Sequence, residues 1–396
     1  MRTFIASLCA GVLLASCAQE FDAGPSAQKS QIPTPGLAQA ELSVTASPLQ
    51  MVDRSDRKIN EISFPCTHNS YNDDSGVFDN GNVSQGMPTQ FARGIRAVEV
   101  DIHERRSWFK KNVSVYHGKI SNGINGSRLA HYVLREVTDF VEDNPDEIVF
   151  LKLETTVSAS KLDKEIRKAG LDKHVFVRDP QNPYPTKAEV VASGKRVVFT
   201  RQIDGSQYGE SLDRHKHGSG ETDKEDHTPQ ASPSDKRFFA FNYYSITSLF
   251  GYGDKDAAKY LNNPSRLAPF ADDVWKLNGK KPWCLTVDYP SVHNGHYYDV
   301  IEALNEKGML KGQILDSDGD LLMKNNGSVI TWTWQCQYSD ETVTAKTSAD
   351  FSFPMKESET VTITPVSDTY NFTPASLTVT NGNVQDVFQA FTATPK

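Results

Sequence analysis

Three short fragments decide the fold of this chain: CTHNSY at residues 66–71, AVEVDI at 97–102 and VYHG at 115–118. Each fragment places groups that can do chemistry beside an apolar run. AVEVDI is apolar enough to be a buried strand, and side chains alternate faces along a strand, so Glu99 and Asp101 point the same way. Two carboxylates in one small space repel each other unless a cation or a shared proton relieves the repulsion. These fragments therefore predict one polar pocket.

A further fragment, EIVFLKLE at 147–154, predicts another buried strand, with Lys152 and Glu154 on one face at its carboxyl end. Strand-like and helix-like segments alternate along the chain. The helix-like segments are 127–144, 160–170 and 297–308, and the strand-like segments are 195–201, 237–244 and 282–290. This alternation is typical of α/β proteins, and we expect a TIM-type (β/α) barrel, regular or irregular, over residues 51–320.

The carboxyl ends of the strands carry the functional side chains in such a barrel. The candidates at or just past these ends are His68, Asp101, His117, Glu154, Arg201 and Asp288. Imidazole is suited to proton transfer at neutral pH, which makes the two histidines candidates for catalysis. The hard oxygen ligands that Ca²⁺ prefers are offered by Asn69, Glu99, Asp101 and Glu154. The alternative is that the carboxylates form salt bridges with Arg96, Lys152 or Arg201.

From residue 321 to residue 396 the character of the sequence changes. Short segments rich in Thr, Val and aromatic residues alternate with turn residues, which is typical of an antiparallel β-sandwich. This tail contains no histidine. We expect it to contribute no catalytic residue.

The composition excludes several classes of protein. A chain of 396 residues with 38% hydrophobic content is long and apolar enough to form a large core. A net charge of −8 and the lack of a clustered Lys/Arg run argue against a nucleic-acid partner. The cysteines are too widely spaced for a zinc site or a disulfide framework.

The first residues predict a bacterial lipoprotein signal peptide over residues 1–16. Arg2 precedes an apolar run that ends in Leu14-Ala15-Ser16-Cys17, so that Cys17 becomes the lipidated first residue. The alternative is an ordinary cleaved signal peptide followed by an incidental cysteine. Residues 17–50 have the Ala, Gln, Ser and Pro composition of a flexible tether. We therefore expect a protein of the bacterial cell envelope, lipid-anchored or secreted.

The fragments PCTHNSY, GIRAVEVDI, VYHG and IVFLKLE together resemble the X domain of phosphatidylinositol-specific phospholipase C, over roughly residues 51–312. The chain is similar to the calcium-dependent branch of this family. Asn69 follows the first histidine, Asp101 stands where the metal-independent enzymes place an arginine, and Glu154 closes its strand. The tail resembles the prealbumin-like sandwiches of bacterial surface proteins through YNFTPASLTVTNG at 370–382.

This resemblance implies cleavage of an inositol phospholipid, or a glycosylated relative, to diacylglycerol and inositol phosphate. The inositol 2-hydroxyl attacks phosphorus, and Ca²⁺ lowers the pKa of that hydroxyl and neutralises developing charge. His117 protonates the leaving oxygen, and His68 donates to the phosphoryl oxygen. Either Glu99 or Glu154 takes the hydroxyl proton. Weaker candidates for phosphate contact are Lys152 and Arg201, for which a structural ion pair is the alternative.

Two other functions compete with this one. The first is a barrel phosphodiesterase that acts on glycerophosphodiesters or sphingomyelin, and the second is a non-catalytic lipoprotein that binds a surface. Both histidines and all four candidate oxygen ligands are present, which disfavours the non-catalytic alternative. We expect a monomer that meets its phospholipid substrate at a membrane surface.

Overall fold

This computed structural model describes residues 52–74, 81–106, 111–117, 127–178, 183–200, 206, 208, 239–245, 253–322, 330–382 and 386–396. These residues belong to one compact unit that spans 47–396. The expected signal peptide and nearly all of the tether lie outside the described residues. No helix within the described ranges is long and apolar enough to cross a membrane.

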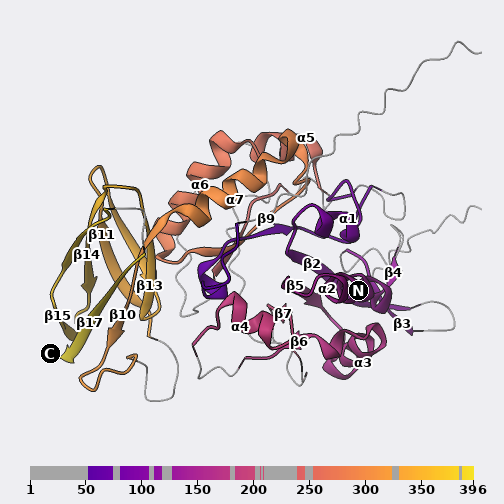
Figure 1. The fold of residues 1–396 in the computed structure, drawn as a ribbon, viewed down its shortest axis with the longest axis horizontal. Helices are drawn as coiled ribbons and strands as arrows, with labels where there is room; N and C mark the ends of the chain where they lie inside the picture. Colours follow the sequence, from indigo (N-terminus) through magenta and orange to yellow (C-terminus); the bar gives the residue numbers. More distant parts are fainter. Residues whose placement is uncertain are drawn as a thin grey trace, which may run out of the picture. The chain divides into compact units, whose positions relative to one another are not determined.

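A parallel sheet forms the centre of the first domain (Figure 1). Its strands are β1 (Phe64–Thr67), β2 (Ala97–Arg106), β5 (Val149–Thr155), β6 (Val175–Phe176), β7 (Val197–Phe199), β8 (Phe239–Asn242) and β9 (Pro282–Val287). They pair in the order β6-β7-β5-β2-β1-β9-β8, and every pair is parallel. The described strands leave β6 and β8 unpaired with each other, so the predicted TIM-type barrel is confirmed in an irregular, open form.

Helices cover this sheet, as the alternating sequence pattern predicts. They are α1 (Met87–Ala92), α2 (Ala130–Asp143), α3 (Ala159–Ala169), α4 (Lys187–Ala192), α5 (Lys255–Leu261), α6 (Pro264–Asn278) and α7 (His296–Glu306), with short 3₁₀ turns at Ile59–Glu61, Leu171–Lys173 and Val292–Gly295. Helix α3 ends at Gly170, whose φ of 74° is a left-handed C-cap that glycine adopts without strain. Helix α4 begins with a capping box between Thr186 and Glu189.

The segment with VYHG does not form a barrel strand, which corrects the expectation that His117 ends one. Strand β3 (Lys111–Val115) pairs antiparallel with β2, and β4 (Arg128–Leu129) pairs antiparallel with β3. The carboxyl-terminal part of the long strand β2 extends beyond the barrel, and β3 pairs with it there. His117 therefore reaches the carboxyl edge of the sheet from an antiparallel hairpin.

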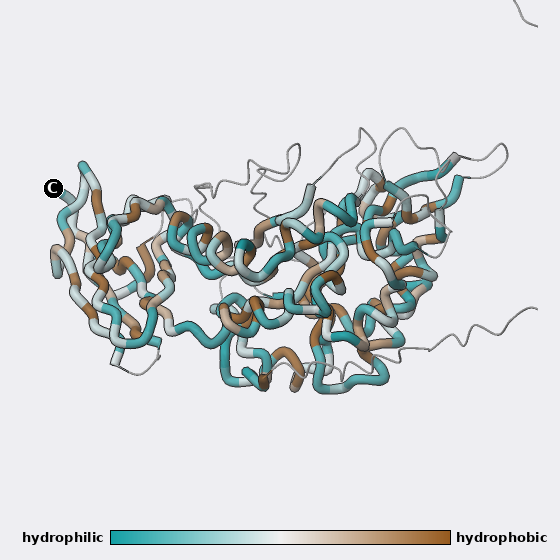
Figure 2. Tube along the Cα trace, turned by 90° about the horizontal axis from the view of Figure 1, so that it is seen from above, coloured by the Kyte–Doolittle hydropathy of each residue, from teal (hydrophilic) through white to brown (hydrophobic). Residues whose placement is uncertain are grey.

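The second domain consists of two four-stranded sheets around one core. Its strands are β10 (Gly308–Leu315), β11 (Trp332–Gln337), β12 (Thr342–Thr347), β13 (Asp350–Met355), β14 (Thr360–Val366), β15 (Tyr370–Thr373), β16 (Leu377–Thr380) and β17 (Val387–Pro395). The sheet orders are β13-β10-β17-β15 and β12-β11-β14-β16. Hydrophobic and hydrophilic positions alternate along these strands (Figure 2), and Trp334, Phe353 and Phe391 meet in the core.

Two details of this all-β domain differ from the expectation. It begins at Gly308 and not at residue 321, because β10 pairs with β13 and β17 and not with any described barrel strand. The β10–β17 pair is parallel, so the first sheet is mixed and not purely antiparallel. Helix α7 correspondingly ends at Glu306.

Helix α6 carries the main contacts between the barrel and the all-β domain. Trp275 Nε1 donates to the backbone oxygen of Ser352 at 3.0 Å, and the backbone N–H of Ser352 donates to Gly279 O at 2.7 Å. Gly279 has a φ of 56°, and a Cβ there would lie only 3.0 Å from the ring of Phe353. The two domains are therefore joined by close backbone packing.

Candidate active site

His68 immediately follows β1 at the carboxyl edge of the barrel. Asn69 continues the chain with a φ of 43°, a left-handed conformation that asparagine tolerates better than most residues. Ser70 fixes this turn to the next strand, because its N–H donates to Glu99 O and its Oγ accepts from the Glu99 N–H, both at 2.9 Å. The turn therefore holds the imidazole and the amide in fixed positions beside β2.

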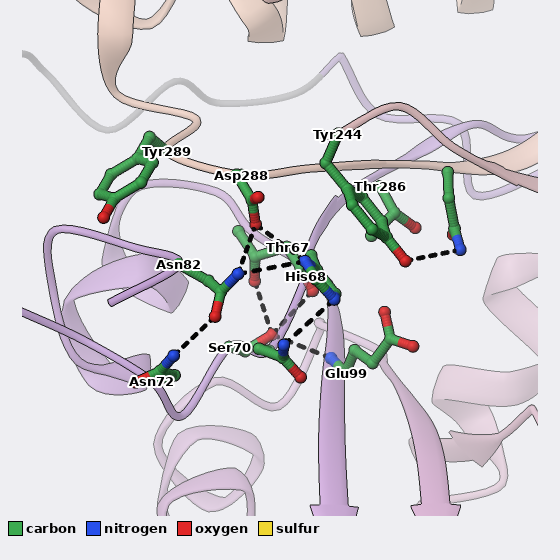
Figure 3. Close-up of polar contacts among 12 residues, drawn as sticks. Thr67, His68, Ser70, Asn72, Asn82, Glu99, Tyr244, Thr286, Asp288 and Tyr289 are labelled. Carbon is green, nitrogen blue, oxygen red and sulfur yellow. Dashed lines mark hydrogen bonds and ion pairs between the residues drawn. The ribbon is translucent and has the colours of Figure 1, made fainter. Parts of the chain in front are cut away.

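Asp288 pairs with His68 from the carboxyl end of β9 (Figure 3). His68 Nδ1 lies 2.9 Å from Asp288 Oδ1, and both side chains are almost fully buried. Tyr244 stacks on the imidazole, with ring centroids 3.7 Å apart and planes only 6° from parallel. Burial opposes the charged imidazole, but the Asp288 carboxylate, and then Glu99 and Asp101, outweigh burial and raise the pKa of His68 above its usual value. The neighbouring carboxylates therefore stabilise the charged form of His68 more than burial destabilises it.

The carboxylates on β2 and β5 lie side by side, as the sequence pattern predicts. In the register of these parallel strands Asp101 is opposite Glu154, and Glu99 is opposite Lys152. Burial, then the charges of Glu154 and Glu99, raise the pKa of Asp101 to about 8. One of its oxygens accepts a hydrogen bond from the Tyr71 hydroxyl at 3.2 Å. The other, Oδ1, is buried and has no hydrogen-bond partner among the described residues.

Lys152 is buried inside the barrel and forms an ion pair with Glu99. The Nζ atom lies 3.3 Å from Glu99 Oε2, and it also donates to Thr286 Oγ1 at 2.7 Å and to Asn242 Oδ1 at 3.3 Å. This geometry favours the structural ion pair over the phosphate contact that we also considered for Lys152. Arg96 pairs with Glu147 and not with a pocket carboxylate.

His117 and Glu154 complete the predicted set. His117 is half-buried and follows Tyr116, whose N–H donates to Asp101 O at 3.3 Å, so the backbone brings His117 beside β2. Glu154 is half-buried at the carboxyl end of β5. Arg201 lies outside the described residues. Among the residues expected at the site, the structure thus gathers the two histidines, Asn69 and the three carboxylates at one edge of the sheet.

Some observations favour a cation site in this pocket, and one argues against it. No set of three His, Cys, Asp or Glu side chains in the described part of the chain is arranged to hold a metal ion. The chemistry of the donors nevertheless fits a hard cation, because Asp101 Oδ1 is a buried acceptor without a partner and a third carboxylate is adjacent. Asn69 Oδ1 and Asp101 Oδ2 both accept from the one hydroxyl of Tyr71, at 3.4 Å and 3.2 Å. Their oxygens therefore lie on one side of the pocket.

The partner of His68 was missed at the sequence level. Asp288 was recognised as a residue at a strand end, but no sequence spacing connects it with His68, which is 220 residues away. The sequence feature that pointed to a role for Asp288 in the site was its position directly after a fully buried strand. Tyr244 carries no comparable signal, because one aromatic residue in an aromatic run does not indicate which ring it contacts.

Comparison with known proteins shows which families this chain is similar to. Residues 54–216 match the family model described as PI-PLC X 1. This part of the chain is therefore similar to the PI-PLC X family. A PI-PLC X domain-containing protein of Arabidopsis thaliana is 26% identical over 276 residues, which are 62% of this chain and 62% of that protein. This chain therefore spans less than two thirds of the length of that relative.

Solved structures with similar folds include two variants of the phosphatidylinositol-specific phospholipase C from Staphylococcus aureus. One has a TM-score of 0.42 and 14% identity, and the other has a TM-score of 0.44 and 13% identity. Each match covers 64% of this chain and 94% of the other. The matched residues include both His68 and His117, whereas Asp288 lies beyond the residues that the family model matches.

Proposed function

We propose that this protein is a phospholipase C that cleaves inositol phospholipids, or their glycosylated relatives, to diacylglycerol and inositol phosphate. The observation that carries the proposal is the buried His68–Asp288 pair beside the carboxylates of β2 and β5, in a chain whose residues 54–216 match the PI-PLC X model. The protein acts as a monomer on phospholipid at a membrane surface of the bacterial cell envelope.

The reaction needs no nucleophile from the protein. The inositol 2-oxygen forms a bond to phosphorus while the bond from phosphorus to the diacylglycerol oxygen breaks, and His117 gives its proton to that leaving oxygen. Glu154 takes the proton of the 2-hydroxyl, because Glu99 is held by Lys152 in a buried ion pair and is less available as a base. The Asp288 carboxylate stabilises the charged form of His68, which donates a proton on Nε2 to a phosphoryl oxygen once the substrate has displaced the Asn69 amide from that nitrogen.

The phosphoryl oxygen replaces the present partner of His68 Nε2. In the structure Asn69 Nδ2 lies 3.1 Å from that nitrogen. The oxygen of the Asn69 amide lies on the same side of the pocket as Asp101 Oδ2, because both are within hydrogen-bonding distance of the Tyr71 hydroxyl. Asn69, Asp101 and Glu154, with the remaining oxygen of Glu99, would hold Ca²⁺. A bound calcium ion supplies positive charge that lowers the pKa of the 2-hydroxyl and stabilises the anionic phosphoryl group.

The test is a hydrolysis panel on vesicles that contain phosphatidylinositol, phosphatidylcholine or sphingomyelin, with soluble glycerophosphodiesters alongside. We expect turnover of the inositol lipid, loss of activity in excess chelator and recovery on adding CaCl₂. His117→Ala lowers turnover by about 10²–10⁴-fold, the usual contribution of a positioned general acid. The matched control is His296→Ala, because His296 is exposed on α7 and, among the described residues, pairs with the surface residue Asp299.

Calcium binding is measured separately from activity. CaCl₂ should raise the Tm of the unaltered protein and leave that of Asp101→Asn nearly unchanged, because calcium relieves the repulsion around a buried carboxylate. Preferred hydrolysis of choline lipids would replace the inositol assignment. Full activity in excess chelator would remove calcium from the mechanism, and equal activity of the two histidine variants would remove His117 as the acid.

A further inference from the structure

Asn82 is a fully buried asparagine that contacts the His68–Asp288 pair of the candidate active site. It lies outside the helices and strands, in a segment that packs against the loop after β9. Its Nδ2 donates to Asp288 Oδ1 at 3.1 Å and lies 3.3 Å from His68 Nδ1 (Figure 3). The Asp288 oxygen that accepts from His68 therefore also accepts from Asn82.

The orientation of the Asn82 amide is determined by its neighbours. Asn72 Nδ2 donates to Asn82 Oδ1 at 2.6 Å, so the oxygen of Asn82 faces a donor and its nitrogen faces the carboxylate. The reverse orientation would place two oxygens against each other at Asp288 and two nitrogens against each other at Asn72. Only one orientation satisfies both contacts, and it directs an N–H at Asp288.

Backbone contacts hold Asn82 from further sides. Its N–H donates to Asn72 O at 2.8 Å, and its carbonyl accepts from the Tyr289 N–H at 2.9 Å. A Cβ at Gly253 would lie 2.9 Å from Asn82 Cα and 3.1 Å from its Nδ2, so the backbone there closes over the side chain. Asn82 is thus packed rigidly, and rigid packing is what a residue needs in order to fix the position of another.

We propose that Asn82 is a positioning residue for the reaction, which acts through Asp288 by holding its carboxylate against His68 Nδ1. A carboxylate held by one donor can rotate about its last side-chain bond, whereas two N–H donors that converge on Oδ1 restrict that rotation and fix the position of this oxygen. Asn82 supplies a neutral donor, so it directs the carboxylate without cancelling the charge that stabilises the His68 imidazolium. Asn72 orients Asn82 in turn. This inference rests on the proposed function, in which His68 is the donor to the phosphoryl oxygen.

The kinetic test compares Asn82→Ala with Asn262→Ala. Asn262 is an equally buried asparagine beside Asp288, but its amide donates to the backbone oxygens of Asp288 and Tyr289, at 2.7 Å and 3.3 Å, and not to the carboxylate. Asn82→Ala should lower kcat about 10- to 100-fold with little change in KM, because a displaced catalytic group costs rate more than binding. Asn262→Ala should lower Tm and keep kcat within a few fold. Equal kcat losses in the two variants would show that Asn82 is merely structural.

A double-mutant cycle shows whether the effect passes through Asp288. In an Asp288→Asn background the additional change Asn82→Ala should lower kcat by less than about twofold, because the carboxylate that Asn82 directs is already absent. Fully additive losses would overturn the proposal. Asn72→Ala should reproduce part of the Asn82→Ala loss through the same contact.

A spectroscopic measurement separates this inference from the proposed function. The proton between His68 Nδ1 and Asp288 should give a low-field ¹H NMR signal, which His68→Ala would assign by removing it. Asn82→Ala should shift or broaden that signal in the folded protein, and Asn262→Ala should leave it in place. An unchanged signal in Asn82→Ala refutes the positioning role whether or not the protein hydrolyses lipid. Failure of the lipid panel with a changed signal would refute the proposed function alone.

Discussion

Replacing Lys152 with methionine tests the ion pair in the barrel interior. The substitution keeps an unbranched side chain, one atom shorter than lysine, and removes its charge. It leaves the nearly inaccessible Glu99 carboxylate without its cation. Removing one partner of a buried pair costs about 3–5 kcal/mol. Thr286 and Asn242 also lose a donor, at about 1 kcal/mol each. The total is comparable with the 5–15 kcal/mol by which a domain is usually stable, so the Lys152→Met barrel should be close to unfolding at 25 °C.

The double variant Glu99→Gln/Lys152→Met is the control. It removes both charges together, so most of the penalty for an unpaired buried charge disappears, and we expect a coupling energy of about 3 kcal/mol. The measurement is urea unfolding followed by circular dichroism and tryptophan fluorescence for the unaltered protein, both single variants and the double variant. If Lys152→Met costs less than about 1 kcal/mol and the two changes add, then Lys152 and Glu99 do not form a buried ion pair.

Four further changes have defined outcomes. Asp288→Asn should lower kcat about 10²–10⁴-fold and move the limb of the pH–rate profile that requires protonated His68 to lower pH, because the carboxylate raises the pKa of that imidazole; an unmoved limb would contradict this. Burial opposes ionisation of Glu147, but its bidentate arginine partner outweighs burial and lowers the pKa of this carboxyl. Glu147→Gln should therefore cost about 1 kcal/mol at pH 7, and the cost should vanish as the pH falls through that lowered pKa, as measured by urea unfolding across pH; a cost that persists at pH 2 would refute the assignment. A chain that ends after Asp320 keeps β10 without β13 and β17, so it should aggregate; a soluble product with an unchanged barrel Tm would show that β10 needs no partner. Cys17→Ser should abolish the lipid mass on the amino-terminal peptide in mass spectrometry, and a lipid-free peptide from the unaltered protein would place the anchor elsewhere.

The carboxylate cluster was predictable because it depends on local periodicity. Alternation along one strand places Glu99 and Asp101 on the same face, and the same rule applies to Lys152 and Glu154 on the next strand. The structure adds only the register, which sets Asp101 opposite Glu154. The capping box between Thr186 and Glu189 likewise depends only on a local spacing of three residues.

Other features depend on contacts that no local pattern encodes. Helices α5 and α6 occupy a stretch for which no element was predicted, and Pro269 inside α6 obscures the helical pattern by removing a backbone donor. Strand β10 was grouped with the barrel because it follows α7 at once, and only its pairing partners in β13 and β17 reveal its domain. The contact between His68 and Asp288 depends on β1 and β9 being neighbours in the sheet.

The parallel pairing of β10 with β17 has a consequence for the order in which the protein is made. Ribosomal synthesis proceeds from the amino terminus at about 5–20 residues per second, and about 80 residues separate the end of β10 at Leu315 from Pro395. The barrel helices are synthesised first. Roughly 4–16 s then pass between the synthesis of β10 and that of β17, its parallel partner in the sheet. During that interval a strand with buried apolar positions has an open edge, to which other nascent chains can bind. A chaperone that covers residues 308–315 during translation would therefore protect this protein more than one that binds the finished barrel.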